Sequence, residues 1–437
     1  ASENTAVGWE ALHANTTGSY NVAYGVNALK LNTTASNNTA VGHSALKVNT
    51  TGTENAALGA FALAANTTAG TNTALGAYSL QSNTTGAGNT AGGRLSLQQN
   101  TTAGNNTAFG LRALTSNTTG ASNVGVGALA LDNNTTGGEL TAVGKQALLS
   151  NTTGASNTAI GCDALDANTT GGSNTAVGRS ALTASTTGEE NVAVGRVALG
   201  ANTTGGFNVG VGKGALASNT TGGYNTAIGR LSLENSTTPS SNTAVGNMAL
   251  RLATTGNVNA AFGVTALYAI TTGAGNTGLG ENAGANITTG NNNICIGRDS
   301  TNLNATESNV ITLGNSSNDN LRCNDTSISS LSDRRDKIEI IDLPAGLDFI
   351  NNLLPRKFKW QTRDGNIKDG LYRAGFIAQE LQEVQKDFDY LDLVLDKNPE
   401  RLEAKQEHLI PVLVKAIQEL STKNTALETR VATLEAA

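Results

Sequence analysis

Residues 157–173 read NTAIGCDALDANTTGGS, and this 17-residue unit decides the fold of most of the chain. Its kernel, an Asn followed by three small or apolar residues and a Gly, returns every 17 residues in 18 copies from Asn4 to Asn293. The Asn is replaced in one copy, by Leu140, and the Gly in none. A weaker echo, NVITLG at 309–314, starts one residue early and is one residue longer. Such a period indicates a solenoid, in which each repeat contacts its neighbours.

Each unit predicts one short strand and two bends. β-Branched residues alternate with Ala after the Asn, as in a strand. The Gly then permits a bend that a side chain would obstruct. The A-L pair is a second short apolar segment, and N-T-T-G has the composition of a turn. We therefore expect a mainly β rod, a β-solenoid or β-roll of one coil per repeat. Coils about 4.8 Å apart would give 18 coils a length of roughly 85 Å.

A single stack of such coils has little apolar material for a core. Each repeat is expected to turn about one Val or Ile, one Leu and some Ala toward the interior. Their burial recovers less free energy than ordering the backbone costs. Hydrogen bonds between coils and stacked rows of Asn and Thr must therefore contribute. Packing several chains side by side would also help, which favours an oligomeric rod without fixing the number of chains.

The composition excludes several classes of protein. The 437 residues have room for two or more domains, but 51 Gly and 14% charged residues are unlike a compact globular domain, which has about 25% charged residues. A net charge of −6 without a basic block argues against a nucleic-acid partner. No apolar run approaches the roughly 18 residues of a membrane span, so no membrane insertion is expected. The chain opens inside a repeat without an initiator Met or a signal-peptide pattern, so we expect a part of a longer protein.

No cofactor or metal site is indicated. Cys162, Cys295 and Cys323 are widely separated and form neither a disulfide framework nor a zinc spacing. His13 and His43 stand at different repeat positions without a cluster of partners. No pair of carboxylates recurs in a fixed geometry, so a glycan-cleaving site in the rod has little support.

The variable and threonine positions of the repeat leave alternatives open. Turn residues such as Trp9 and Tyr20 are read as solvated, although loops can also form a receptor-contacting face. N-T-T matches the acceptor of N-glycosylation, and rows of Thr could form an ice-binding face. We favour the interpretation of N-T-T-G as a turn over both.

The composition changes after the repeats. Residues 1–297 are assigned to the rod, and residues 298–331, rich in Ser, Asn, Thr and Asp, to a neck with short strands. Residues 332–437 bring Pro, Phe, Trp, Arg and Lys together and predict a small α+β domain. We expect a helix over 345–353, then a strand, a turn, a second strand and a second helix.

The chain ends in a predicted coiled coil over about 406–436. Apolar residues recur with heptad spacing, interrupted by one Asn at an a position, a residue type that often sets register and chain number. Ile and Val at a with Leu at d would favour a parallel dimer in isolation, whereas the long rod of short coils favours three chains. We follow the trimer and assign trimerisation to the heptad residues Leu413, Ile417, Leu420, Asn424, Leu427, Val431 and Leu434.

Two segments resemble known families. The kernel is similar to the N-S-V-A-I-G unit of trimeric autotransporter adhesin heads, which are left-handed parallel β-rolls; NVAVG at 191–195 is among the nearest copies. The run SISSLSDRRDKIEIIDLPAGLDFINNLLPRKFKW, followed by GFIAQEL and the heptad tail, resembles the intramolecular chaperone domain of phage tail spikes and fibres, the S74 peptidase family. This second resemblance covers 332–437.

The S74 resemblance implies a homotrimer that cuts itself once, between Leu331 and Ser332. It implies that Ser332 is the nucleophile and Lys337 the base. The chemistry is coherent, because a serine hydroxyl is inert until a base accepts its proton. A lysine can accept it only where burial or nearby positive charge favours its neutral form. Arginines at 334–335 would supply such charge and the flanking aspartates would oppose it. Residues five apart do not share a helix face, so the pair needs a turn or a contact between chains.

The resemblance also implies a function. It indicates the distal part of a phage tail fibre, a virion component made in the host cytoplasm, which binds a host cell-surface receptor, a glycan or an outer-membrane component. The alternative is a bacterial trimeric surface adhesin or structural fibre with the same chaperone, and a third is an enzyme acting on surface glycans. Near-identical repeats invite slippage between chains by one repeat, a physical reason for a C-terminal clamp.

Overall fold

The computed structural model describes residues 2–302, 304–318, 332–361, 367–396 and 402–436. The chain divides into two compact units, Ala1–Asp319 and Asn320–Ala437, and each is described by itself. The predicted neck, 298–331, has residues in both units.

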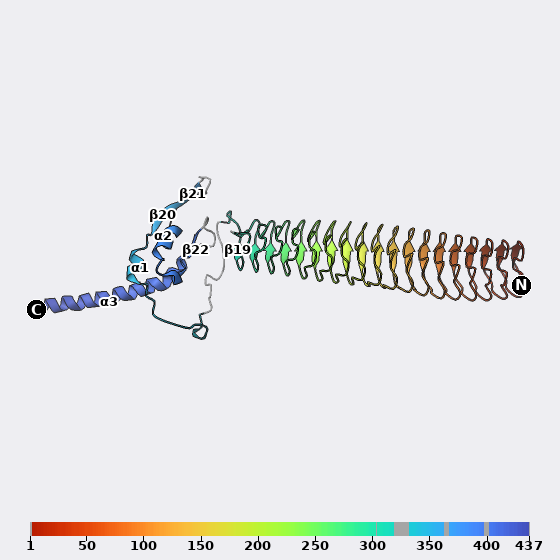
Figure 1. The fold of residues 1–437 in the computed structure, drawn as a ribbon, viewed down its shortest axis with the longest axis horizontal. Coiled ribbons are helices and arrows are strands. Elements are labelled where there is room, and N and C mark those ends of the chain that lie inside the picture. The colour runs from red at the N-terminus through yellow and green to blue at the C-terminus, as the bar shows by residue number, and fades with distance from the viewer. Residues whose placement is uncertain (1, 303, 319–331, 362–366, 397–401, 437) are drawn as a thin grey trace. The chain divides into compact units, whose positions relative to one another are not determined.

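The first unit is a column of short parallel strands, one per repeat (Figure 1). Each strand pairs in parallel with the strand one repeat away; Thr158, for example, lies opposite Thr141 and Thr175. The prediction of a mainly β solenoid with one coil per 17 residues is confirmed. Within the described residues the sheet has 19 strands: β1 Thr5–Val7, β2 Val22–Tyr24, β3 Thr39–Val41, β4 Ala56–Leu58, β5 Thr73–Leu75, β6 Thr90–Gly92, β7 Thr107–Phe109, β8 Val124–Val126, β9 Thr141–Val143, β10 Thr158–Ile160, β11 Thr175–Val177, β12 Val192–Val194, β13 Val209–Val211, β14 Thr226–Ile228, β15 Thr243–Val245, β16 Ala260–Phe262, β17 Thr277–Leu279, β18 Ile294–Ile296 and β19 Ile311–Leu313.

The repeat register continues past the last Asn kernel. Ile311 in β19 pairs with Ile294 in β18, 17 residues earlier. The backbone N of Val310 donates to Asn293 Oδ1 at 3.0 Å, so Val310 stands where other coils have the kernel Asn. The expectation that this last copy starts early and is longer is therefore wrong. Its first residue is Val310, and Asn309 belongs to the turn before it.

The coil interior is filled by Ala, Leu and Asn. Side chains alternate along a strand, so the central residue, an Ala in most strands, faces inward; Ala159 in β10 is an example and is fully buried. The Leu of the A-L pair, such as Leu165, is also fully buried. The third strand residue, such as Ile160, faces outward and is exposed. The expectation that one Val or Ile per repeat joins the interior is wrong, because the inward Ala fixes the alternation.

Two buried Asn rows tie one coil to the next. In the kernel row, the backbone N of Asn191 donates to Asn174 Oδ1 at 3.0 Å, and Asn191 Nδ2 donates to Gly205 O at 2.9 Å. In the N-T-T-G row, Asn168 Nδ2 donates to Asn151 Oδ1 at 2.8 Å. An amide side chain carries both donors and an acceptor, so identical residues one coil apart satisfy one another. The expected stacked Asn rows are therefore present and buried.

The kernel Gly is required by its conformation and its surroundings. Gly161 has a φ of +137°, and a Cβ there would lie 2.6 Å from the carbonyl O of Gly178 in the next coil. No L-residue side chain fits that approach. This explains why the Gly occurs in every copy.

A defect in the second Asn row predicts a stabilising substitution. Ser185 replaces Asn in this row, and Ser185 Oγ and Asn168 Oδ1 are both buried without a hydrogen-bond partner. Ser185→Asn should supply the missing amide and raise the stability of the rod by about 1–3 kcal/mol, the usual cost of leaving buried groups unsatisfied. Thermal unfolding followed by circular dichroism would measure it. The exposed turn variant Ser173→Asn, at a position where other coils carry Asn, should have no effect, and equal melting of both variants would contradict the prediction.

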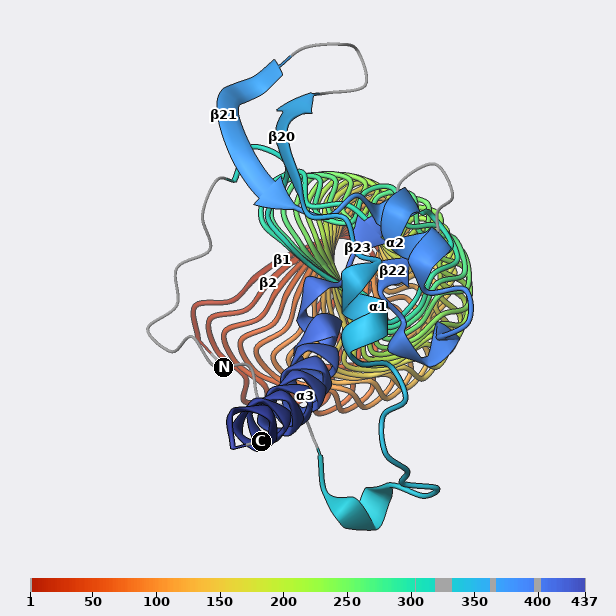
Figure 2. The ribbon, with the colours of Figure 1, turned by 90° about the vertical axis from the view of Figure 1, so that its left-hand side faces the viewer.

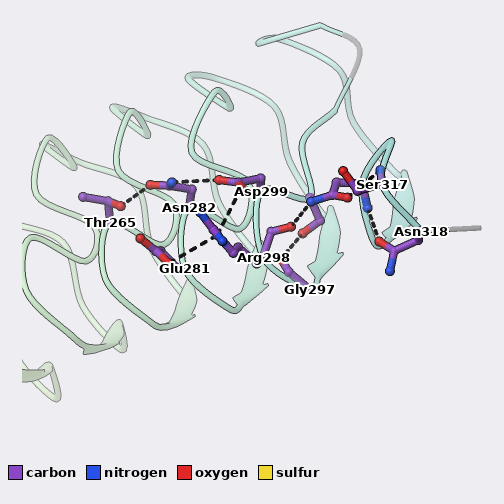
Figure 3. Close-up of polar contacts among 10 residues, drawn as sticks. Thr265, Glu281, Asn282, Gly297, Arg298, Asp299, Ser317 and Asn318 are labelled. Carbon is purple, nitrogen blue, oxygen red and sulfur yellow. Dashed lines mark hydrogen bonds and ion pairs between the residues drawn. The ribbon is translucent and has the colours of Figure 1, made fainter. Parts of the chain in front are cut away.

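Polar contacts join the last coils of the rod (Figure 3). Asn282 Nδ2 donates to Asp299 Oδ1 at 2.8 Å. Arg298 Nε lies 3.4 Å from Glu281 Oε2 and 3.3 Å from Asp299 Oδ2. Asn315 Nδ2 donates to the carbonyl O of Arg298 at 2.8 Å. Most of these contacts link a residue to one in the neighbouring coil, 17 positions away, and so tie the last coils of the rod together.

The second unit is small and mixes helices with short strands. Phe349, Leu381, Leu393 and Val412 are buried in its core. β20 and β21 form an antiparallel hairpin (Figure 2), and β22 pairs with β23. The expected helix, strand, strand and helix are present in that order. Their bounds are η1 Arg334–Asp336, α1 Leu347–Asn351, β20 Arg356–Gln361, β21 Ile367–Gly375, α2 Ala378–Val384, η2 Asp389–Leu391, β22 Val394–Leu395, β23 Glu403–Ala404, η3 Gln406–His408 and α3 Leu409–Glu435.

Candidate active site

The segment that begins at Ser332 folds into a tight turn. Asp333 Oδ1 accepts from the backbone N of Arg335 at 2.9 Å and so begins the single 3₁₀ turn η1. The backbone N of Lys337 donates to Arg334 O at 3.2 Å and ends it. The turn reverses the chain, and Lys337 Nζ donates to Ser332 Oγ at 2.6 Å. Five residues of separation are thus bridged within one chain, by a turn.

The charges around this contact are partly paired with each other. Arg335 forms an ion pair with Asp333, with 2.6 Å between its guanidinium nitrogen and the carboxylate oxygen. The hydrogen bonds from the Arg335 side chain and backbone hold the pKa of the Asp333 carboxyl below its ordinary value. One of the two arginines expected to supply positive charge is therefore engaged by an aspartate.

Ser332 and Lys337 are both exposed in the single chain. In this contact Lys337 Nζ donates to Ser332 Oγ, whereas a base would have to accept the hydroxyl proton, so the contact alone does not activate the serine. The residues that follow are apolar and uncovered: Ile338 is 87% exposed, and Ile340 and Ile341 are also exposed. The pair thus lies beside an exposed apolar segment, and such segments are typical of interaction surfaces.

The heptad residues lie on one exposed side of α3. Leu409, Val412 and Ala416 of this helix are buried. All six apolar members of the predicted trimerisation set are exposed in the single chain, from Leu413 to Leu434. Asn424 Nδ2 donates to Glu428 Oε1 at 3.0 Å, one turn along its own helix. The structure thus gathers the predicted residues on one helix, and their role in trimerisation stays a prediction.

The outward residues of the solenoid strands form a further apolar surface, which sequence reasoning missed. They are the third residues of the strands, and the register of neighbouring strands places them opposite one another, as Ile160 lies opposite Val143. The row is interrupted at β6, whose third residue is Gly92. We call this set the outer apolar row. The inward Ala was the available signal, because it places the next residue outside. Its exposed members are Val7, Tyr24, Leu58, Leu75, Phe109, Val126, Val143, Ile160, Val194, Ile228, Phe262, Leu279, Ile296 and Leu313.

The cysteines and histidines have ordinary structural surroundings. Cys162 and Cys295 are free thiols, and burial raises the pKa of Cys295, which keeps it unreactive. Cys323 lies outside the described residues. His43 contacts Phe61 edge-on, with 5.0 Å between ring centroids. In the part of the chain that the structure describes, no group of three or more His, Cys, Asp or Glu could hold a metal ion, and no helix is long and apolar enough to cross a membrane.

Comparison with known families defines the class of the C-terminal segment. Residues 332–390 match the model of the peptidase S74 family, described as the chaperone of endosialidase. This is a family of self-cleaving chaperone domains, and the resemblance found in the sequence is confirmed. A β-solenoid rod followed by this segment fits a fibre or spike that carries its own chaperone. Searches among curated proteins and among solved structures gave no match. Leu331, on the other side of the predicted cleavage site, lies outside the described residues.

Proposed function

We propose that the chain is the distal part of a phage tail fibre, a homotrimer that binds a host cell surface. Its C-terminal domain would bring three chains into register and then release itself by cutting between Leu331 and Ser332. The observation that carries the proposal is that the chaperone match begins at Ser332 itself, the residue whose Oγ lies 2.6 Å from Lys337 Nζ. The rod precedes that residue and would remain as the mature product.

The proposed cleavage uses Ser332 as nucleophile and Lys337 as base. The neutral Lys337 amine takes the hydroxyl proton while Ser332 Oγ attacks the carbonyl carbon of Leu331. The C–N bond breaks, the proton passes to the Ser332 nitrogen, and an ester joins Leu331 to Ser332 Oγ. Water then hydrolyses the ester, which leaves a carboxylate on Leu331 and restores the hydroxyl. Cleavage would follow assembly, because a second chain must desolvate the lysine before it can act.

The partner that fits the outer apolar row is another copy of the same chain. The row has one apolar member in each coil except that of β6, where Gly92 stands, so it follows the period of the coil stack. Only a partner with the same period can contact it along its whole length. The exposed heptad face of α3 is a second surface for the same partner, since contiguous exposed apolar residues are typical of interfaces.

A test of the proposed function uses the mature rod, residues 1–331. The rod should have three times the mass of one chain by light scattering, and fluorescently labelled rod should be retained by some strains in a panel of bacteria. Val143→Asp with Ile160→Asp should lower its melting temperature and its mass, because the charges enter a surface that we place between chains. Thr153→Asp with Thr170→Asp, in exposed turns of neighbouring coils, is the matched control. A monomeric wild-type rod would exclude the fibre, and a trimer that adheres to no strain would exclude host binding.

A further inference from the structure

An open groove of about 420 Å³ crosses four successive coils of the rod. This volume lies within the range of about 300–1,000 Å³ that is usual for small-molecule sites. The groove is lined by a row of threonines that includes Thr204, by Glu189, by Gly206 and Gly223, and by the rings of Phe207 and Tyr224. We call it the ring groove.

The two rings are stacked on each other and open to solvent. Their centroids are 5.0 Å apart and their planes differ by 2°. Phe207 is 45% exposed and Tyr224 65% exposed. The rod has another aromatic stack, Phe61 on Tyr78, whose rings are half-buried. Burial in the rod explains the pair in the ring groove less well, because both rings are exposed, and exposed aromatic side chains that lie together are typical of binding sites.

The sequence around the rings keeps the groove hollow. The rings belong to consecutive coils and occupy the same repeat position, where the neighbouring coils carry Glu190 and Ser241. Each ring follows two glycines, in Gly205–Phe207 and Gly222–Tyr224, so no side chain fills the floor between the rings and the threonines. Thr187, Thr204 and Thr221 also line the groove, and each of these side chains carries a hydroxyl group.

These groups suit a carbohydrate without a negative charge. The apolar C–H face of a pyranose packs on an aromatic ring, while the hydroxyls at its rim need hydrogen-bond partners. The threonine hydroxyls and the Glu189 carboxylate offer such partners. The lining has a carboxylate and no Lys or Arg, so an acidic sugar would meet repulsion.

We propose that the ring groove binds one or two neutral sugar residues of a cell-surface glycan. The proposal rests on the proposed function and gives its receptor a chemical class. Three symmetry-related grooves on a trimer would strengthen weak single contacts through multivalency.

The test applies labelled trimeric rod to a printed panel of neutral and acidic glycans. Wild type should bind at least one neutral glycan more strongly than the acidic ones. Phe207→Ser with Tyr224→Ser should weaken that binding tenfold or more, measured by titration with the same glycan. Other coils carry Ser at this position, so the variant should fold; its melting temperature and trimer mass verify this. Tyr20→Ser is the control, since Tyr20 is an exposed aromatic at the same repeat position between Glu3 and Asn37.

Three results would overturn the inference. Binding unchanged in the double variant would place the glycan site elsewhere on a functional fibre. A wild-type rod that adheres to cells but to no neutral glycan of the panel would remove the ligand class and leave the proposed function standing. Loss of the trimer in the double variant would show that the rings belong to the interface between chains. A rod that binds neither cells nor glycans would instead refute the proposed function itself.

Discussion

Ser332→Ala is expected to leave the 437-residue chain whole, whereas the wild-type chain should separate into residues 1–331 and 332–437. The substitution removes the Ser332 hydroxyl, which accepts a hydrogen bond from Lys337 Nζ at 2.6 Å. It should change little else, because Ser332 is exposed. Loss of a nucleophile slows such a reaction by about a thousandfold or more. Intact mass of freshly produced chain, with samples run boiled and unboiled on a denaturing gel, would measure both cleavage and assembly.

Two further variants separate the chemistry from the charge. Lys337→Arg keeps the positive charge and the reach of the side chain but supplies no neutral base, so it should also remain whole. Ser317→Ala, a serine at the end of the rod, should cleave like wild type. Cleavage of the Ser332→Ala chain at the wild-type rate would contradict the role of Ser332 as nucleophile. If the wild-type chain also stays whole, the domain is a permanent clamp.

Ile417→Asp with Leu420→Asp is expected to convert the proposed trimer into monomers and to stop cleavage as well. Both residues are exposed on the heptad face of α3, where a partner helix would bury them. Six carboxylates would then meet in one trimer core, at a cost of several kcal/mol per chain. Cleavage should fail with assembly, because Ser332 and Lys337 remain solvated in the single chain. Size-exclusion chromatography with light scattering and the same gel would report both effects.

The matched control places the same charges on the opposite side of the helix. Thr422→Asp with Thr429→Asp adds two carboxylates at exposed f positions, so the trimer and its cleavage should persist. A wild-type dimer would contradict the chain number that we propose and would agree instead with the Ile, Val and Leu pattern of the heptads. Cleavage in a monomeric variant would show that desolvation by a second chain is not needed.

The sequence predicts the rod well because one local rule repeats. Each recurring position of the kernel has one physical reason. An Asn such as Asn157 hydrogen-bonds to the next coil, and a Gly such as Gly161 lies too close to the next coil's backbone for a side chain to fit. The direction of Ile160 was mispredicted, because hydrophobicity alone says that Ile is inside, whereas the alternation set by Ala159 puts it outside. Composition cannot tell an apolar core from an apolar interface.

The sequence nominates Ser332 and Lys337 as a catalytic pair, which stays a prediction, and it does not predict how the two side chains meet. Spacing left two routes open for Ser332 and Lys337, a turn or a contact between chains. The structure has the turn, in which Asp333 caps η1. From the sequence, Asp333 counted only as a negative charge that opposes the arginines. The ring groove depends on residues 17 apart, Phe207 and Tyr224, which become neighbours only once the coil period is used to align them.

The unbroken 17-residue register has a consequence for how such a fibre can change over generations. Each coil meets its neighbours through the same paired strands and the same Asn contacts, so a whole repeat can be duplicated or deleted by recombination without disturbing the seam on either side. Every such event lengthens or shortens the rod by one strand spacing, about 4.8 Å. The length of the rod is thus adjustable in small fixed increments. The exposed turn residues belong to individual coils, so they can be exchanged one repeat at a time.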